Sequence, residues 1–254
     1  IYNSNGVGNM EKRYIIGIDQ STQGTKALLF DGVGHLLRRT DLPHRQIVNE
    51  KGWVSHDLNE IYRNTVQTVK TLVAESGVAP ETIAGIGISN QRETTAIWDK
   101  ATGEPLEEAI VWQCGRASGI AQEIAEQGHA EEIREATGLQ LSAYFPAAKM
   151  AWLLRNGGEE RQKRAADGEL CLGTIDSWLV YKLTGDHAFK TDFSNASRTQ
   201  LFNLKTLAWD EKICEMFGIP ACALARVCDS DAVYGTTTME GLFSEPVPIC
   251  GVLG

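Results

Sequence analysis

Three short apolar segments near the start of the chain, separated by polar turns, limit the folds it can adopt. Residues 14–18 and 26–30 are typical of buried strands, and residues 35–40 follow as a third strand after a turn at 31–34. Strands joined by connections this short pair with one another in antiparallel fashion. The sequence therefore predicts that the domain opens with an antiparallel three-stranded meander.

Helix and strand patterns alternate along the rest of the chain. Asp57 and Glu60 have the spacing of a capping box, and apolar residues from Tyr62 to Val73 recur at helical spacing until Gly77 ends the helix. Further strands are predicted at 83–89, 94–98, 109–112, 170–173 and 247–253, and further helices within 116–168, over 175–183 and near 210–217. This alternation predicts an α/β domain with an elaborated middle.

Composition narrows the class of protein. A chain of 254 residues can bury a substantial core as one large domain. Its 24 basic and 33 acidic side chains give a formal net charge of -9, which repels phosphate backbones and anionic lipid headgroups. We therefore expect neither a nucleic acid nor a membrane surface as a partner. No apolar run approaches the roughly 20 residues of a membrane span.

The cysteines and histidines do not have the spacing of a metal site. The six cysteines are scattered without a Cys-x-x-Cys pair. The five histidines form no pair at the spacing that would let two of them bind one metal ion from a helix. We expect no zinc site and, without a signal peptide, a cytoplasmic protein. Residues 1–9 are interpreted as a tag or disordered remnant, with Met10 as the native start and 10–254 as the domain.

The first candidate site is the polar connection 19–25 between two apolar strands. Consecutive backbone N–H groups and hydroxyls in a tight hairpin can bind phosphates, and Asp19 at the end of the strand could organise a metal ion. The alternative is an ordinary polar hairpin in which Asp19 bonds its own turn. The residues alone leave both interpretations open.

The second candidate site directly follows the buried strand that ends at Ser89. Ligands of open α/β sheets bind at the carboxyl ends of strands. There, the guanidinium of Arg92 can donate and the carboxylate of Glu93 can accept, so together they could grip neighbouring hydroxyls of a polyol. The alternative is a surface ion pair.

Aromatic residues supply a third element of the candidate site. Trp112 follows an apolar strand and Tyr144 lies in a break between helices, and sugars and polyols pack their C–H faces on such rings. Core packing is the competing interpretation. We prefer it for the other tryptophans, which are Trp98, Trp152, Trp178 and Trp209.

Taken together and in this order, these segments resemble the FGGY family of carbohydrate kinases, and within it the glycerol-kinase branch. The resemblance extends from about residue 14 to residue 254. The matching motifs are Ile18-Asp19-Gln20, Gly52-Trp53-Val54, the string Ser-Asn-Gln-Arg-Glu-Thr-Thr at 89–95, Ile-Val-Trp-Gln-Cys at 110–114, Tyr144-Phe145 with Lys149, Gly-Thr-Ile-Asp-Ser-Trp-Leu at 173–179 and Asn-Ala-Ser-Arg-Thr at 195–199.

The resemblance implies an α/β fold of the ribonuclease-H-like, actin-type ATPase class, with a mixed sheet and inserted helical and β elements. It also implies transfer of the γ-phosphoryl group of ATP to a terminal hydroxyl, with magnesium, by a protein that is a dimer or tetramer of identical chains at full length. The implied polyol contacts are Arg92, Glu93, Trp112 and Tyr144. The implied nucleotide-phosphate contacts are Thr22, Gln23, Gly24 and Lys26, and Asp19 would serve the magnesium ion.

Some positions depart from the pattern of the branch and leave the preferred substrate open. Ser21 stands where a glycine is usual, and Lys26 where an arginine is usual, which loses bidentate phosphate geometry. Gly115 replaces an arginine, and Ser142-Ala143 replaces Asp-Pro. The leading hypothesis is therefore a glycerol-kinase-like protein, and the alternative is a kinase for another polyol or a ketose such as xylulose or ribulose.

The family pattern has an Asp-Gln pair immediately after the position of Gly254, and its aspartate is the general base. We expect residues 10–254 to be an N-terminal polyol-binding domain whose C-terminal nucleotide-binding domain is absent, and to be catalytically silent alone. Two other classes stay open: a non-catalytic half-kinase that binds a polyol or a partner, and an actin-like assembly protein or sugar-responsive regulator.

Overall fold

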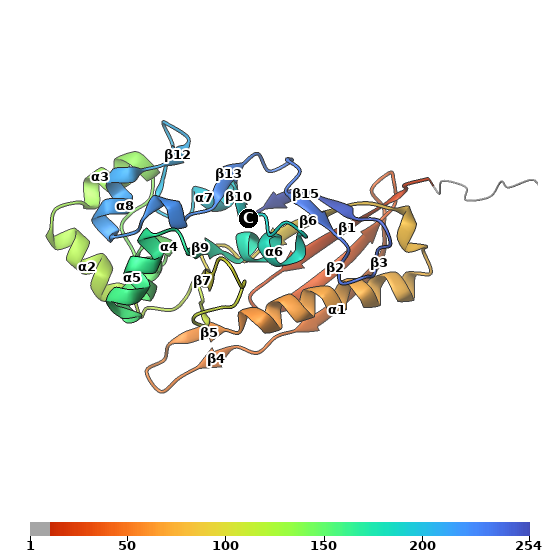
Figure 1. Cartoon of the computed structure of the whole chain (residues 1–254), viewed down its shortest axis with the longest axis horizontal. Helices are drawn as coiled ribbons and strands as arrows, with labels where there is room; N and C mark the ends of the chain where they lie inside the picture. Colours follow the sequence, from red (N-terminus) through yellow and green to blue (C-terminus); the bar gives the residue numbers. More distant parts are fainter. Residues whose placement is uncertain (1–10) are drawn as a thin grey trace, which may run out of the picture.

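The larger of the two main sheets is a mixed sheet of six strands at one end of the molecule (Figure 1). The computed structural model describes residues 11–254, so the interpretations of residues 1–9 and of Met10 lie outside it. The strand order is β14-β15-β6-β1-β2-β3. The bounds are β1 Tyr14–Gln20, β2 Gly24–Phe30, β3 Leu36–Pro43, β6 Ile83–Asn90, β14 Gly235–Thr237 and β15 Val247–Leu253. Strands β1, β6 and β15 run parallel, whereas β2, β3 and β14 pair antiparallel with their neighbours.

The predicted opening meander is confirmed, but its first turn is tighter than expected. The strands extend to Gln20 and begin again at Gly24, so only residues 21–23 form the turn. Asp19 is consequently a strand residue and lies opposite Lys26 in the β1–β2 ladder. The reason is local pairing: Ser21 donates its N–H to the carbonyl of Gly24 at 2.9 Å, which closes the hairpin early.

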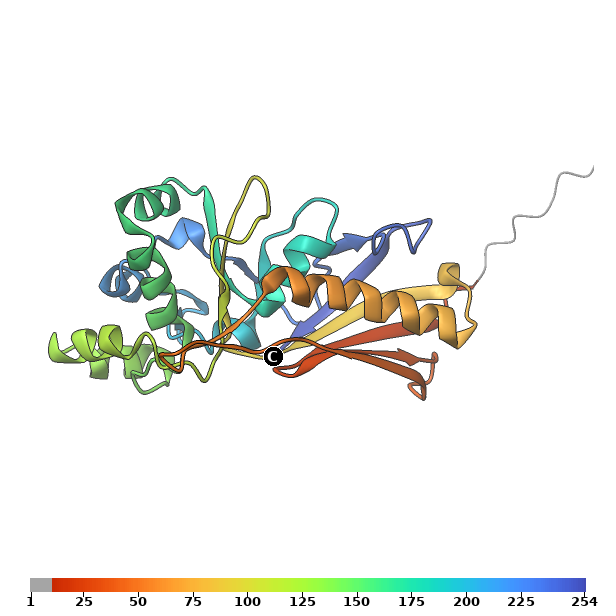
Figure 2. The same ribbon diagram turned by 90° about the horizontal axis from the view of Figure 1, so that it is seen from below.

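Two helices cover one face of this sheet (Figure 2). Helices α1 (Leu58–Ser76) and α6 (Ile175–Leu183) pack their apolar residues with β1, β2, β6 and β15 in one shared core. Asp57 caps α1, and Gly77 ends it at φ 73°, both as predicted. The reciprocal half of the predicted capping box is wrong, because the Glu60 carboxylate accepts from the N–H of Arg45 instead.

A smaller antiparallel sheet continues the molecule toward a cluster of helices (Figure 1). Its order is β4-β5-β8-β7-β9, with bounds β4 Ile47–Val48, β5 Val54–His56, β7 Thr95–Asp99, β8 Ala109–Ile110 and β9 Leu170–Thr174. The helices that build the second core with it are α2 Ser118–Glu126, α3 Ala130–Thr137, α4 Pro146–Asn156, α5 Gly158–Ala166 and α8 Glu211–Phe217. The strand predicted at 109–112 ends at Ile110, so Trp112 lies in the following turn.

The stretch 191–199, for which no helix or strand was predicted, contains regular structure. Strand β10 (Lys190–Asp192) pairs in parallel with β13 (Arg226–Cys228), and the one-turn helix α7 (Phe193–Ala196) follows, capped by Asp192. The remaining elements are β11 Phe202–Asn203, β12 Ala208–Trp209 and two 3-10 turns at Pro80–Thr82 and Ala221–Ala223. The sequence did not predict α7, because a single helical turn is too short to show the spacing of apolar residues by which a helix is recognised.

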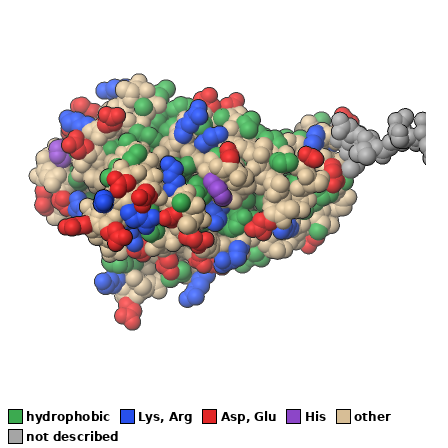
Figure 3. Space-filling model, viewed as in Figure 1, with side chains coloured by type: hydrophobic (Ala, Val, Ile, Leu, Met, Phe, Trp, Pro, Cys, Tyr) green, Lys and Arg blue, Asp and Glu red, His purple; other side chains and the backbone are tan. Residues whose placement is uncertain are grey.

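Trp98 and Trp178 are fully buried, as predicted, and Trp152 and Trp209 pack partly buried on the second core. On the face seen in Figure 3, basic and acidic side chains are interspersed. Within residues 11–254, no helix combines the length and apolar character needed to cross a bilayer.

Candidate functional site

The carboxyl ends of three parallel strands meet at one edge of the large sheet. Asp19 of β1 lies opposite Ser89 of β6, and Leu253 of β15 lies opposite the same Ser89. Because these strands run in the same direction, the segments that follow them emerge side by side. The turn after β1 and the segment 91–94 after β6 are therefore neighbours.

A hydrogen bond joins the first and third predicted elements of the site. The indole N–H of Trp112 donates to Oγ1 of Thr22 at 3.0 Å, and the backbone N–H of Trp112 donates to Oγ1 of Thr94 at 3.2 Å. The ring of Tyr144 lies 5.7 Å from that of Trp112, centroid to centroid. Trp112 thus touches both strand-end segments and forms one wall with Tyr144.

Two pockets flank Trp112. One, of about 230 Å³, reaches to Tyr144, and the other, of about 360 Å³, reaches to His44 and the turn after β1. The first is lined by Trp112, Gln113, Cys114, Gly115, Ser118, Ala121, Ser142, Ala143 and Tyr144. The second is lined by Thr22, Gln23, His44, Gln46, Trp112 and Gln113. Both offer aromatic surface beside neutral hydrogen-bonding groups, a composition suited to a small hydroxyl-bearing molecule.

Glu93 has an unusual backbone conformation. Its φ is 61°, and the N–H of Thr94 donates to the carbonyl of Arg92 at 2.8 Å, so Glu93 is the central residue of a three-residue turn. A positive φ in a non-glycine residue carries strain that surrounding contacts must hold. The turn gives the two predicted polyol-binding residues different environments. Glu93 is buried, with 4% of its surface exposed, whereas Arg92 is exposed and lies beside Gly254.

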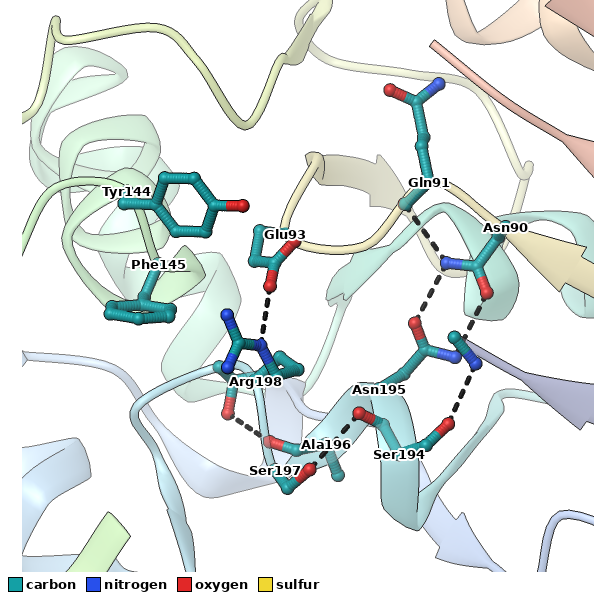
Figure 4. A network of polar contacts seen from close by, with 12 residues as sticks. Asn90, Gln91, Glu93, Tyr144, Phe145, Ser194, Asn195, Ala196, Ser197 and Arg198 are labelled. Atoms are coloured by element: carbon teal, nitrogen blue, oxygen red, sulfur yellow. Dashed lines mark hydrogen bonds and ion pairs between the residues drawn. The ribbon is translucent and has the colours of Figure 1, made fainter. Parts of the chain in front are cut away.

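Arg198 holds the Glu93 carboxylate. Its Nε donates to Oε1 of Glu93 at 2.7 Å (Figure 4). Arg92, by contrast, has no recorded hydrogen bond or ion pair with any side chain of the described residues. Arg92 and Glu93 therefore do not pair with each other, and the alternative of a simple surface ion pair between them is wrong.

Two buried glutamines lock the strand ends together, and sequence reasoning gave them no role. The N–H of Gln91 donates to the carbonyl of Gln20 at 2.6 Å, and Nε2 of Gln91 donates to Oε1 of Gln20 at 2.9 Å. Nε2 of Gln91 also lies 3.3 Å from Nδ1 of His56. The sequence held one signal of this contact: Gln20 ends a largely apolar strand. A buried side-chain amide needs a hydrogen-bond partner, so such a residue indicates a polar contact at the strand end.

His56 and His44 form a buried pair next to these glutamines. Their ring centroids are 4.4 Å apart, in edge-to-face contact. Burial lowers the pKa of His56 to about 3, with a smaller effect of the neighbouring His44, and burial also lowers the pKa of His44. Both rings are therefore neutral at pH 7, and they contribute packing rather than charge to the edge of the second pocket.

Lys149 fixes the backbone that carries Tyr144. The fully buried ammonium donates to the carbonyls of Ala143, at 2.7 Å, and of Tyr144. Burial lowers the pKa of Lys149 to about 7. The two hydrogen bonds of Lys149 close the turn before α4, and Tyr144, which is 39% exposed, lines the pocket.

The predicted phosphate-binding and metal-binding residues lie in the turn after β1 and in the adjoining ends of β1 and β2. Two findings go beyond the prediction. Lys26 pairs with the Asp19 carboxylate at 2.7 Å, so the predicted phosphate and metal residues contact each other. Gly24 is needed for packing: a Cβ there would lie 2.6 Å from the carbonyl oxygen of Leu42. The glycine is therefore explained by the close approach of β3.

The predicted magnesium site would have one carboxylate, that of Asp19. Within residues 11–254, no three His, Cys, Asp or Glu side chains are grouped so as to hold a metal ion. Mg²⁺ commonly keeps several waters and is bound through one or two carboxylates plus substrate phosphates. The half-exposed Asp19 suits that mode, in which most of the ligands come from phosphate and water.

Comparison with known proteins identifies relatives over nearly all of the described chain. Residues 14–254 match the model of the FGGY family of carbohydrate kinases, N-terminal domain. The chain is 44% identical over 241 residues to glycerol kinase 1 of Thermotoga maritima, covering 95% of this chain and 49% of that protein. It is 46% identical over 244 residues to the glycerol kinase of Enterococcus casseliflavus, covering 96% and 48%.

A solved structure has the same fold. The glycerol kinase of Plasmodium falciparum with ADP superposes with a TM-score of 0.87 at 35% identity, covering 96% of this chain and 49% of that one. The predicted α/β fold of the actin-type class is thereby confirmed. The chain spans about half the length of the relatives it matches.

Proposed function

The chain belongs to the FGGY family of carbohydrate kinases, and on that premise we propose that it is the polyol-binding half of a kinase that converts glycerol and ATP to glycerol 3-phosphate and ADP. The observation that carries the proposal is the hydrogen bond between the Trp112 indole and Thr22. It places a ring suited to a polyol against the turn suited to the phosphates, which is where the acceptor and donor of a phosphoryl group must meet.

Each residue of the site has a role in this proposal. Arg92 donates to polyol oxygens, the Glu93 carboxylate accepts from polyol hydroxyls, and Trp112 and Tyr144 contact the carbon chain. Thr22, Gln23 and Lys26 approach the nucleotide phosphates, and Gly24 shapes their turn. Asp19 orients the waters of Mg²⁺, which would supply neutralisation of phosphate charge. Positioning and electrostatics carry most of such a reaction.

The proposal includes an aspartate directly after the position of Gly254 as the general base, and a second domain that completes the nucleotide site. It rests on the match to an N-terminal domain and on the coverage of about half of each relative. It also includes assembly of identical chains at full length and a cytoplasmic location, which the six free thiols of the chain suit.

A different polyol or a ketose is the second candidate substrate. The observation that favours it is the lining of the pocket of about 230 Å³, because Gly115, Ser142 and Ala143, three departures from the pattern of the glycerol-kinase branch, all lie there. Small residues at these positions would leave room for a longer carbon chain than that of glycerol.

Calorimetric titration of the purified 254-residue chain tests both candidates. We expect saturable binding of glycerol, accompanied by a change in tryptophan fluorescence, and at least tenfold weaker binding for Arg92→Ala. Arg13→Ala, which loses an exposed ion pair with Glu11, is the matched control and should bind as the wild type does. Tighter binding of xylulose or ribulose than of glycerol would favour the second candidate, and binding of no polyol would refute both.

The need for a second domain has its own test. The chain incubated with glycerol, ATP and Mg²⁺ should release no ADP above background, because the proposal puts the base elsewhere. Release of ADP at a rate that depends on glycerol would contradict that part of the proposal.

A further inference from the structure

We infer that Arg198 is a positioning residue for the polyol site, which holds the Glu93 carboxylate in the orientation that accepts the substrate hydroxyl. The inference rests on the proposed function and adds a residue to it. Arg198 lies 105 positions after Glu93, and no role at the site follows for it from the sequence alone.

The first support is the geometry of the contact. Nε of Arg198 donates to Oε1 of Glu93 at 2.7 Å, a short charge-assisted bond. Within the described residues, Oε2 of Glu93 accepts no hydrogen bond, so this oxygen is left for a ligand. A bond through one oxygen tethers the carboxylate and leaves its second oxygen available.

The second support is that two contacts set the register between the segments. The side-chain amides of Asn90 and Asn195 bond reciprocally, at 2.9 and 3.1 Å, and this pair is also 105 positions apart. Residues 90 and 93 are therefore matched to residues 195 and 198 (Figure 4). These two contacts hold the strained turn at Glu93 against a separate segment of the chain. A positive φ at a residue other than glycine persists only where surrounding contacts of this kind hold it.

The third support is the rigidity of the segment that carries Arg198. The buried Asp192 carboxylate accepts hydrogen bonds from the backbone and side chains of Ser194 and Asn195, and from the hydroxyl of Ser230. The hydroxyl of Ser194 in turn accepts from the N–H of Gly254 at 2.8 Å. The segment is thus anchored to the end of β15 as well as to the end of β6.

The fourth support is the position of the guanidinium between two parts of the candidate site. Its central carbon lies 5.0 Å from the centroid of the Phe145 ring, and Phe145 follows Tyr144 in the chain. One side chain therefore contacts the turn of Glu93 and the turn of Tyr144. Displacing the guanidinium would therefore remove a contact from both turns at once.

A thermodynamic cycle measured by calorimetric polyol binding tests the inference on the 254-residue chain. Arg198→Ala should weaken glycerol binding by about 10- to 100-fold in the wild-type background, the loss expected for a hydrogen bond to a charged group. In the Glu93→Gln background, the same substitution should cause little further loss, because Arg198 acts through the Glu93 carboxylate. Arg155→Ala breaks an ion pair with Glu123 on the helical surface and is the matched control, with unchanged binding.

Chemical rescue separates positioning from a general structural effect. Guanidinium ion, added below denaturing concentrations, should restore part of the affinity of Arg198→Ala and none of that of Glu93→Gln. Arg198→Lys should be intermediate, because an ammonium keeps the charge but lacks the planar donor. If Arg198→Ala unfolds, as judged by circular dichroism, Arg198→Lys takes its place in the same cycle.

The outcomes are distinct. Equal glycerol affinity for the wild type and the Arg198 variants, or equal losses in both backgrounds, would overturn the inference alone. A wild-type chain that binds no polyol would overturn the proposed function and the inference with it.

Discussion

The Asp19 carboxylate and the Lys26 ammonium face each other across the β1–β2 ladder and form an ion pair of 2.7 Å. The family resemblance implied different ligands for these two residues, a metal ion for Asp19 and a phosphate group for Lys26. In the proposed kinase, a metal ion that binds Asp19 or a phosphate that binds Lys26 must therefore either break this ion pair or bind alongside it. The charges of these two strand residues, which flank the turn after β1, therefore balance each other before any nucleotide binds.

A double-mutant cycle with Asp19→Asn and Lys26→Met measures this pair. Both side chains are partly exposed, so we expect a coupling energy of only about 0.2–1 kcal/mol in urea unfolding. A coupling energy above about 2 kcal/mol would contradict this expectation, because it would mean that the ion pair stabilises the fold strongly and does not open easily for a ligand.

Gly24→Ala should destabilise the protein. The new Cβ would lie 2.6 Å from the carbonyl oxygen of Leu42 and 2.9 Å from Cα of Pro43, so the β2–β3 backbones must move apart. Overpacking of this kind typically costs about 1–3 kcal/mol. Gly119→Ala in α2 is the control: its Cβ meets open space, and alanine is favoured in helices, so its free energy of unfolding should be unchanged or higher. Equal stability of the two variants would contradict the close approach of β3.

Acid should destabilise the protein through His56. Burial lowers the pKa of His56 to about 3 in the folded state, from 6.5 in the unfolded chain. Between those pH values the unfolded state binds more protons, so stability is full above pH 6.5 and falls as the pH falls toward 3. One histidine shifted in this way contributes a loss of roughly 2 kcal/mol between pH 6.5 and 5.

Urea unfolding of the wild type and of His56→Gln at several pH values checks this expectation. The variant should show a shallower loss of stability with acid, because it lacks the titrating ring. The buried His44, whose pKa burial also lowers, should account for part of the remaining slope. His129→Gln, at the start of α3, is the control and should keep the wild-type slope. Parallel curves for the wild type and His56→Gln would refute the assignment to His56.

Thr22→Val should weaken polyol binding without unfolding the protein. The substitution keeps the shape of the side chain but removes the acceptor of the Trp112 indole N–H, which then lies unpaired beside the pocket. We expect a several-fold loss of glycerol affinity and a shift of the tryptophan emission, measured by fluorescence titration. Thr71→Val, which removes the acceptor of Nε2 of Gln67 on α1, is the matched control. Unaltered affinity in Thr22→Val would separate Trp112 from the site.

The sequence predicted the fold well where hydrophobic patterns are local. The meander, helix α1 with Asp57 and Gly77 at its ends, and strands β6 and β15 all follow from periodicity and capping over a few residues. It failed at α7, where one helical turn is set by the Asp192 side chain, and at Glu60, whose carboxylate found a partner in Arg45. In both places, a contact with a particular neighbour outweighed the local preference.

For the candidate site, the amino-acid sequence by itself determined the residue types and their places at strand ends, because parallel strands bring their carboxyl ends to one edge. Only the tertiary structure decided the partners. The bonds from Arg198 to Glu93 and from Trp112 to Thr22 join segments 105 and 90 residues apart. Contacts of that separation leave no periodic trace in a single chain, since they depend on how whole elements pack rather than on the spacing of neighbouring residues.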